Sequence, residues 1–212
     1  MNELGFIPVS PIAIIQIVAA YLLGSIAFGI LVSKLFKLPD PRTVGSGNPG
    51  ATNVLRSGKK SAAALTLLGD AFKGWFPVWL VMQPDGGVMW ITSAVAIAVF
   101  LGHLYPDPVF HKFKGGKGVA TALGVMMAIS PSLALAALLT WAVIFLLTKF
   151  SSLSAIVAAM MAPVYAWYLL DDAYHDFEMV VVFVSIMLVW RHRTNIQKLL
   201  NGTEAGFGKK KH

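Results

Sequence analysis

The chain has 212 residues, of which 57% are hydrophobic and only 13% charged, with a formal net charge of +7 and a mean hydropathy of +0.70. A soluble globular domain carries roughly 25% charged residues, so the composition argues against one and predicts a membrane protein. The absence of cysteine excludes disulfides, thiolate catalysis and thiolate metal sites.

Long apolar runs predict seven transmembrane helices. In chain order they cover residues 12–32, 61–82, 88–105, 118–130, 132–148, 153–170 and 177–190. The first run is too long for the core of a signal peptide, so we interpret it as a retained helix. One helix spanning the fourth and fifth runs would extend about 46 Å, well beyond a ~30 Å hydrocarbon core. Pro131 also disfavours helix at Ser130, so two helices are expected there.

The charged residues predict the orientation of these helices. With the N-terminus outside, every Lys and Arg except Lys73 falls in an inward loop or in the tail. The charged residues of the outward segments are all acidic. The sequence therefore predicts an all-α integral membrane protein with seven transmembrane helices, the N-terminus outside and the C-terminus cytoplasmic. Residues 1–204 are expected to form one membrane domain and 205–212 a basic cytoplasmic tail. In so apolar a chain, these cations indicate cytoplasmic loops and anion sites, and no nucleic acid partner is expected.

Asp70 and Lys73 are the only opposite charges within one predicted span. Their i,i+3 spacing allows them to pair, and ionisable groups inside a membrane are usually functional or paired. Because both lie beyond the first turn of their helix, away from the loops, we interpret them as a structural ion pair.

The first inward loop contains the glycine-rich segment 45–56, GSGNPGATNVLR. It matches G-x-G-x-x-G, but a membrane helix precedes it in place of a strand, which argues strongly against dinucleotide binding. Its glycines allow backbone N–H groups to approach an anion, while Ser46, Thr52 and Arg56 add donors for a phosphate. The alternative is a flexible loop followed by a helix cap at Thr52 or Asn53.

The second inward loop runs from Gly102-His103 to the turn 113–121, FKGGKGVAT. A basic glycine-rich turn that leads into a helix is a second anion-binding device. It is not a Walker motif, because Gly118 follows Lys117 where Ser or Thr would hold magnesium. We interpret Lys112 and Lys114 as ordinary loop charges and Lys117 as a candidate ligand.

The segment after the last apolar run reads RHRTNI over residues 191–196 and continues to NGTE over 201–204. If the last helix continues inward, His192 and Asn195 share a face and can reach one ligand. Capping or solvation of these two side chains is the alternative.

Three motifs, in three of the inward segments, together resemble the bacterial acyl-phosphate:glycerol-3-phosphate acyltransferase (PlsY) family. They are S-G-N-x-G-A-T-N-x-x-R at 46–56, G-H at 102–103 with F-x-G-G-K-G-V-A-T at 113–121, and H-x-x-N at 192–195 with G-T-E at 202–204. The resemblance covers residues 12–204. It implies an enzyme of the bacterial inner membrane that transfers a fatty acyl group from acyl phosphate to glycerol 3-phosphate, giving lysophosphatidic acid and phosphate, the first step of phospholipid synthesis. One departure is the segment 105–108, which is longer than the family's usual path from the histidine to the glycines.

The resemblance also implies roles for individual residues. The predicted catalytic set, in contact with the reacting phosphates or glycerol phosphate, is Ser46, Arg56, Lys117, His192 and Asn195. The predicted substrate-binding set is Gly47, Asn48, Gly50, Thr52, Asn53, His103, Gly115, Gly116, Gly118, Thr121 and Glu204. The expected partners are acyl phosphate, glycerol 3-phosphate and membrane lipids, with no metal and no other cofactor. Such substrates need anion cradles at the membrane surface beside an apolar groove.

Acyl phosphate is an activated anhydride, and Ser46 has no histidine partner nearby in the sequence. We therefore expect direct attack by the glycerol hydroxyl without a covalent enzyme intermediate. His103 and His192 are the candidate proton acceptors; the charges of Arg191 and Arg193 should keep His192 neutral, and we favour an orienting role for it. An anion transporter is the main alternative, but it predicts two related halves and midplane charges. A membrane scaffold would leave the three motifs unexplained.

Overall fold

The computed structural model describes residues 10–82, 88–106, 115–171, 174 and 176–207. Within these ranges the chain is helical and contains no strand, as the composition predicts. Its helices are α1 (Pro11–Gly24), α2 (Phe28–Leu35), α3 (Ala51–Arg56), α4 (Lys60–Met82), α5 (Met89–Leu104), α6 (Val119–Ile129), α7 (Pro131–Thr148), α8 (Ser151–Leu169), α9 (Asp176–Arg191) and α10 (Arg193–Leu200).

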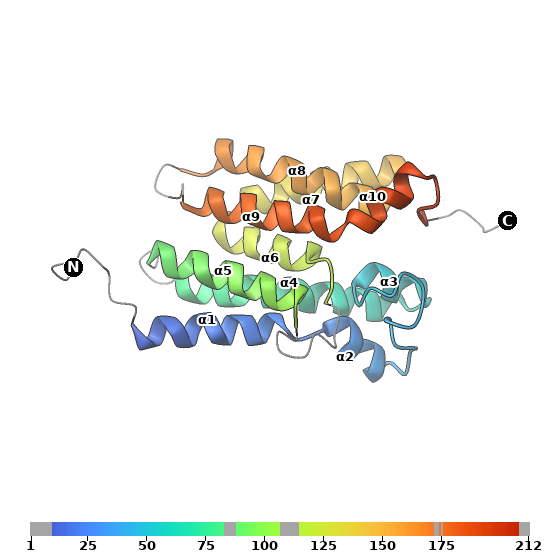
Figure 1. Cartoon of the computed structure of the whole chain (residues 1–212), viewed down its shortest axis with the longest axis horizontal. Coiled ribbons are helices and arrows are strands. Elements are labelled where there is room, and N and C mark those ends of the chain that lie inside the picture. The colour runs from blue at the N-terminus through green and yellow to red at the C-terminus, as the bar shows by residue number, and fades with distance from the viewer. Residues whose placement is uncertain (1–9, 83–87, 107–114, 172–173, 175, 208–212) are drawn as a thin grey trace.

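The longer helices lie side by side along the long axis of the molecule, and the short helices α2, α3 and α10 gather at one end of the bundle (Figure 1). The three sequence motifs lie in or beside these short helices and in the turn that precedes α6. The fold therefore brings all three motifs to the same end of the bundle.

Two helices, α7 and α8, are each long and apolar enough to cross a membrane alone. The bent pairs α1–α2 and α9–α10 raise the number to four if each pair is one span, and α5 and α6 are apolar but shorter. These counts of possible membrane spans refer to the described part of the chain. The count of seven spans and the orientation of the two termini stay predictions.

The first predicted span is broken, contrary to the single helix expected over residues 12–32. The axes of α1 and α2 are bent by 47°, and the break leaves the carbonyl of Ile26 outside the regular helical pattern. Lys73 Nζ of α4 donates a hydrogen bond to this carbonyl at 2.6 Å. Because a lone carbonyl is costly in an apolar layer, a lysine distant in the sequence makes the break possible.

The break expected at Ser130-Pro131 is confirmed. Ser130 is extended, with φ −154° and ψ 114°, and its Oγ accepts a hydrogen bond from the backbone N–H of Leu133 at 3.4 Å. Pro131 occupies the first turn of α7, where a missing N–H costs nothing. A serine cap followed by proline thus ends α6 and starts α7.

Small residues bring α4 and α6 into close contact. A Cβ on Gly74 would meet the carbonyl oxygen of Thr121 at 2.2 Å, and one on Gly124 would meet that of Ala71 at 2.0 Å. Such close approach of backbones is typical of helix packing in membranes. It places the charged turn of α4, which carries Asp70 and Lys73, directly against the start of α6.

Candidate active site

The motif segments surround a cavity of about 470 Å³. Its polar part is lined by the first inward loop, the turn before α6, α10 and residues 203–205. Its apolar part lies among α6, α7, α8 and α9 and includes Leu123, Met126, Leu138, Trp141 and Leu188. A cavity that joins a charged end to an apolar end suits a ligand with a polar head and a hydrocarbon tail.

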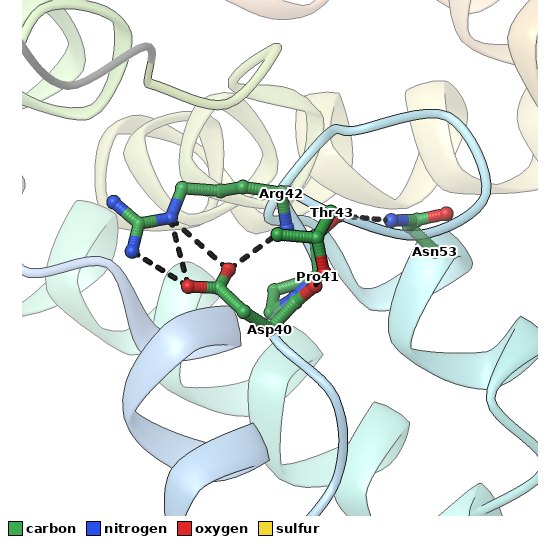
Figure 2. Close-up of polar contacts among 5 residues, drawn as sticks. All are labelled: Asp40, Pro41, Arg42, Thr43 and Asn53. Carbon is green, nitrogen blue, oxygen red and sulfur yellow. Dashed lines mark hydrogen bonds and ion pairs between the residues drawn. The ribbon is translucent and has the colours of Figure 1, made fainter.

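Asn53 holds the first glycine-rich loop. Its side chain is buried and points at the turn that contains Pro41, as Figure 2 shows. The amide Nδ2 donates to the carbonyls of Pro41 at 2.7 Å and Val44 at 3.0 Å, and Oδ1 accepts from the backbone N–H of Ser46 at 2.9 Å. Both amide hydrogens of Asn53 are therefore used within the loop, although the residue also lines the cavity.

The helix that follows this loop begins without a side-chain cap. The cap residue is Gly50, so the sequence alternative of a cap at Thr52 or Asn53 is wrong. Instead, the hydroxyl of Thr52 lies 3.2 Å from that of Ser151 at the start of α8. This contact joins the first motif to a helix in which the sequence showed no motif.

The second glycine-rich turn, residues 115–118, packs tightly against the end of α5. The backbone N–H of Gly116 donates to the carbonyl of His103 at 3.2 Å. A Cβ on Gly115 would lie 2.3 Å from that same oxygen, and one on Gly116 would lie 2.1 Å from His103 Nε2. The turn therefore lies against His103 despite the longer sequence at 105–108; residues 107–114, including Lys112, Phe113 and Lys114, lie outside the described residues.

Lys117 starts a chain of hydrogen bonds that crosses the cavity. Its Nζ donates to Asn195 Oδ1, and Asn195 Nδ2 donates to Glu204 Oε1 at 2.7 Å. The same carboxylate oxygen accepts from the hydroxyl of Ser152 at 2.6 Å. Burial lowers the pKa of Lys117 to about 8, with Arg56 among the charges that lower it and Glu204 opposing them. Lys117 is therefore fully protonated only when the pH lies well below this pKa.

His192 lies at the junction of α9 and α10, which are bent by 54° relative to each other. The predicted continuation of the last helix is therefore bent, yet His192 and Asn195 both line the cavity. His192 Nδ1 lies 2.8 Å from the carbonyl of Leu188. Because a carbonyl only accepts, Nδ1 carries the hydrogen and the neutral ring keeps a lone pair on Nε2.

Burial is the main cause that lowers the pKa of His192, to about 4, and the charges of Lys117 and Arg191 lower it further. The hydrogen bond to Leu188 opposes them. The expected neutral state of His192 agrees with this direction, although burial contributes more than the neighbouring arginine. A ring with so low a pKa accepts a hydrogen bond near neutral pH but is a weak base.

The predicted ion pair between Asp70 and Lys73 is confirmed, with Nζ and Oδ1 2.8 Å apart. Thr121 links Asp70 to His103 at the end of α5: its hydroxyl donates to the Asp70 carbonyl at 3.0 Å and lies 3.1 Å from His103 Nδ1. Since a hydroxyl has one hydrogen, Thr121 accepts from Nδ1–H of His103. Asp70 and His103 line the cavity, so this polar cluster supports its inner wall.

Arg56 faces the segment after α10. Its Nη2 donates to the carbonyl of Ala205 at 2.9 Å, and its guanidinium lies 5.7 Å from the ring centroid of Phe207. The backbone N–H of Phe207 donates to the Lys149 carbonyl at 2.9 Å. Residues 205–207, expected to be the start of a separate tail, thus pack against the site, and Ala205 lines the cavity.

Most of the predicted site residues line the cavity. They are Ser46, Asn48, Gly50, Thr52, Asn53, Arg56, His103, Lys117, Gly118, His192, Asn195 and Glu204. Gly47, Gly115, Gly116 and Thr121 are not among the lining residues. Three residues that contact the predicted site residues had no predicted role in the site: Arg191, Ser151 and Ser152. Of these, only Arg191 had a sequence signal, since it adjoins His192.

Comparison with protein families matches residues 14–202 to the family described as glycerol-3-phosphate acyltransferase. A glycerol-3-phosphate acyltransferase of Methylobacillus flagellatus is 68% identical over 198 residues, which cover 92% of this chain and 96% of the relative. One of Bordetella pertussis is 56% identical over 199 residues, which cover 92% of each chain.

Two solved structures of PlsY, described as an integral membrane glycerol 3-phosphate acyltransferase, share the fold. The glycerol 3-phosphate form gives a TM-score of 0.84 at 41% identity and covers 92% of this chain and 96% of the other. The lysophosphatidic acid form gives 0.83 at 40% identity, with coverage of 92% and 95%. The likeness therefore extends over nearly the whole length of both chains.

Proposed function

The chain belongs to the glycerol-3-phosphate acyltransferase family, and from this membership and the shape of the cavity we propose that it acylates the 1-hydroxyl of sn-glycerol 3-phosphate with acyl phosphate as donor. The products are lysophosphatidic acid and inorganic phosphate. The observation that carries the proposal is that one cavity joins Lys117 and Arg56 to an apolar groove. Basic groups suit the phosphates of both substrates, and the groove suits the acyl chain.

Lys117 and Arg56 bind phosphate in this mechanism, with Ser46 and the two glycine-rich loops around them. The glycerol hydroxyl attacks the acyl carbon, and the bond from that carbon to the phosphate oxygen breaks. Positive charge at the site stabilises the leaving phosphate, so no covalent enzyme intermediate is needed.

His192 orients glycerol 3-phosphate by accepting a hydrogen bond at Nε2 from its 2-hydroxyl, and a phosphate oxygen of the donor takes the proton of the attacking 1-hydroxyl. This assignment follows from the low pKa of His192, about 4, which makes it a poor general base near neutral pH. His192→Ala should raise KM for glycerol 3-phosphate and leave the acidic limb of the pH profile in place. Loss of that limb with an unchanged KM would show that His192 is the base instead.

The decisive experiment is phosphate release from acyl phosphate by purified protein, with and without glycerol 3-phosphate. We expect release that depends on glycerol 3-phosphate, needs no added metal and persists in a chelator. Activity with acyl-coenzyme A alone would defeat the donor assignment. A transporter or a scaffold would release no phosphate under either condition.

We propose a location in the bacterial inner membrane with the cavity open to the cytoplasm. The chain has no cysteine, so single cysteines report one position each. Asp171→Cys should be labelled from outside, whereas Asn201→Cys should be labelled only after permeabilisation; both positions are exposed on the protein. Labelling of Asn201→Cys from outside would contradict the seven-helix topology.

A further inference from the structure

Arg191 at the end of α9 holds the second glycine-rich turn through the backbone carbonyls of the turn. Its Nη2 donates to the carbonyls of Gly115 at 2.9 Å and Gly116 at 3.0 Å, and its Nε donates to Gly116 at 3.2 Å. Lys117 and Gly118 line the cavity, whereas Arg191 and the two glycines are not among its lining residues. One guanidinium thus fixes two successive carbonyls of the turn.

These contacts determine where the N–H groups of the turn point, because a trans peptide unit directs its C=O and N–H in opposite directions. The unit between Gly115 and Gly116 is held at both ends, by Arg191 on its carbonyl and by the His103 carbonyl on its N–H. The next unit, between Gly116 and Lys117, is held only at its carbonyl. Within the described residues, the backbone N–H of Lys117 has no hydrogen-bond partner.

We propose that Arg191 is a positioning residue of the phosphate site: by binding the carbonyls of Gly115 and Gly116, it directs the backbone N–H of Lys117 at the phosphate that the Lys117 ammonium also binds. The inference rests on the proposed function, since it deepens the role of the same site. A cation on the carbonyl also polarises the peptide unit and strengthens its N–H as a donor.

The proposal requires the fork of a guanidinium and not only its charge. Arginine presents several N–H groups in a fixed plane, whereas lysine is a compact point charge. Arg193, two residues along, is the matched control: its Nη1 donates only to the carbonyl of Trp190, at 3.3 Å, and its guanidinium lies 4.3 Å from the centroid of that residue's ring. Both arginines add charge at the same end of α9, but only Arg191 contacts the turn.

The first experiment compares Arg191→Lys with Arg193→Lys. We expect Arg191→Lys to raise the Ki of inorganic phosphate and the KM of one phosphate substrate about tenfold, from the loss of charge-assisted hydrogen bonds, with a smaller change in kcat. The substrate whose KM rises is the one whose phosphate lies at this turn. Arg193→Lys should match the wild type. Wild-type constants in Arg191→Lys would overturn the proposal and leave the proposed function standing.

A second measurement uses the unaltered protein, so it does not depend on the folding of a variant. With ¹⁵N-labelled lysine, the backbone amide of Lys117 should shift when inorganic phosphate is added, and its hydrogen exchange should slow. An amide of Lys117 that does not respond at saturating phosphate would overturn the proposal. A wild-type protein without glycerol 3-phosphate-dependent phosphate release would instead refute the proposed function itself.

Discussion

The two glycine-rich loops have similar compositions but are held in different ways. Residues 45–50 are exposed over 45–47 and are held by the side chain of Asn53, which accepts from the N–H of Ser46, and by a backbone hydrogen bond from Gly47 to Val44. Residues 115–118 are largely buried and are held through their backbone by His103 and Arg191. We therefore expect the backbone of the first loop to move more easily when a ligand binds than the backbone of the second.

Glycine serves two purposes, and both occur in each loop: Gly118 of the second loop also has a positive φ, +84°, and a Cβ on Gly45 of the first would meet Asn53 Oδ1 at 2.3 Å. Gly45 and Gly47 have φ values of +58° and +69°, which other residues rarely adopt. Gly115 and Gly116 are required for space, because a Cβ would meet the carbonyl or ring of His103. Sequence alone shows the glycines but not which of these two reasons applies.

The largest expected effect is that of Gly116→Ala. Its Cβ would lie 2.1 Å from His103 Nε2, and the ring cannot move away without losing its contact with the Thr121 hydroxyl, so we expect no detectable activity and a lower Tm. Gly47→Ala is the matched change in the first loop, where the nearest atom is 3.4 Å away. Alanine at this positive φ should lower the free energy of unfolding by roughly 1–2 kcal/mol. Equal losses in both variants would contradict the distinction between the loops.

Lys117→Ala should lower kcat/KM about a hundredfold or more, because it removes the partly buried ammonium group that is proposed to bind the substrate phosphates. Lys60→Ala is the control, since Lys60 is exposed and is not among the cavity-lining residues. Steady-state kinetics with both substrates provide the measurement. A similar loss in Lys60→Ala would mean that the site uses general loop charge.

The second loop carries a group that titrates near neutral pH, since the pKa of Lys117 is lowered to about 8. In the proposed mechanism the protonated form binds phosphate, so kcat/KM should fall about tenfold per pH unit above that value. Lys117→Arg keeps its charge over this range and should lose the alkaline limb. An unchanged limb in Lys117→Arg would assign it to another group.

Asn53→Ala should raise KM about tenfold and lower the Tm, because the side chain is buried and its loss leaves the carbonyls of Pro41 and Val44 without their donor. Asp40→Ala is the control in the same loop. Asp40 forms an exposed ion pair with Arg42 at 2.6 Å, as Figure 2 shows, and such pairs contribute little. Unchanged Tm and KM in Asn53→Ala, as expected for Asp40→Ala, would contradict the role of Asn53 in holding the loop.

The sequence predicted the features that depend on local patterns. Apolar runs located the helices from α4 to α9, Ser130-Pro131 marked a break, and the i,i+3 spacing identified Asp70 and Lys73. It could not predict the break between α1 and α2, because the group that compensates Ile26 is Lys73, on another helix. The contacts of Arg191 depend likewise on a turn distant in the sequence.

The segment after α10 affects how this chain can be shortened. Gly202, with φ +67°, reverses the chain, so that Glu204 reaches Asn195 and the carbonyl of Ala205 reaches Arg56. Deletion of residues 203–207 would leave all the apolar helices intact and still remove a wall of the cavity. We expect the protein with this deletion to insert into membranes and to fold, but to have a lower catalytic activity.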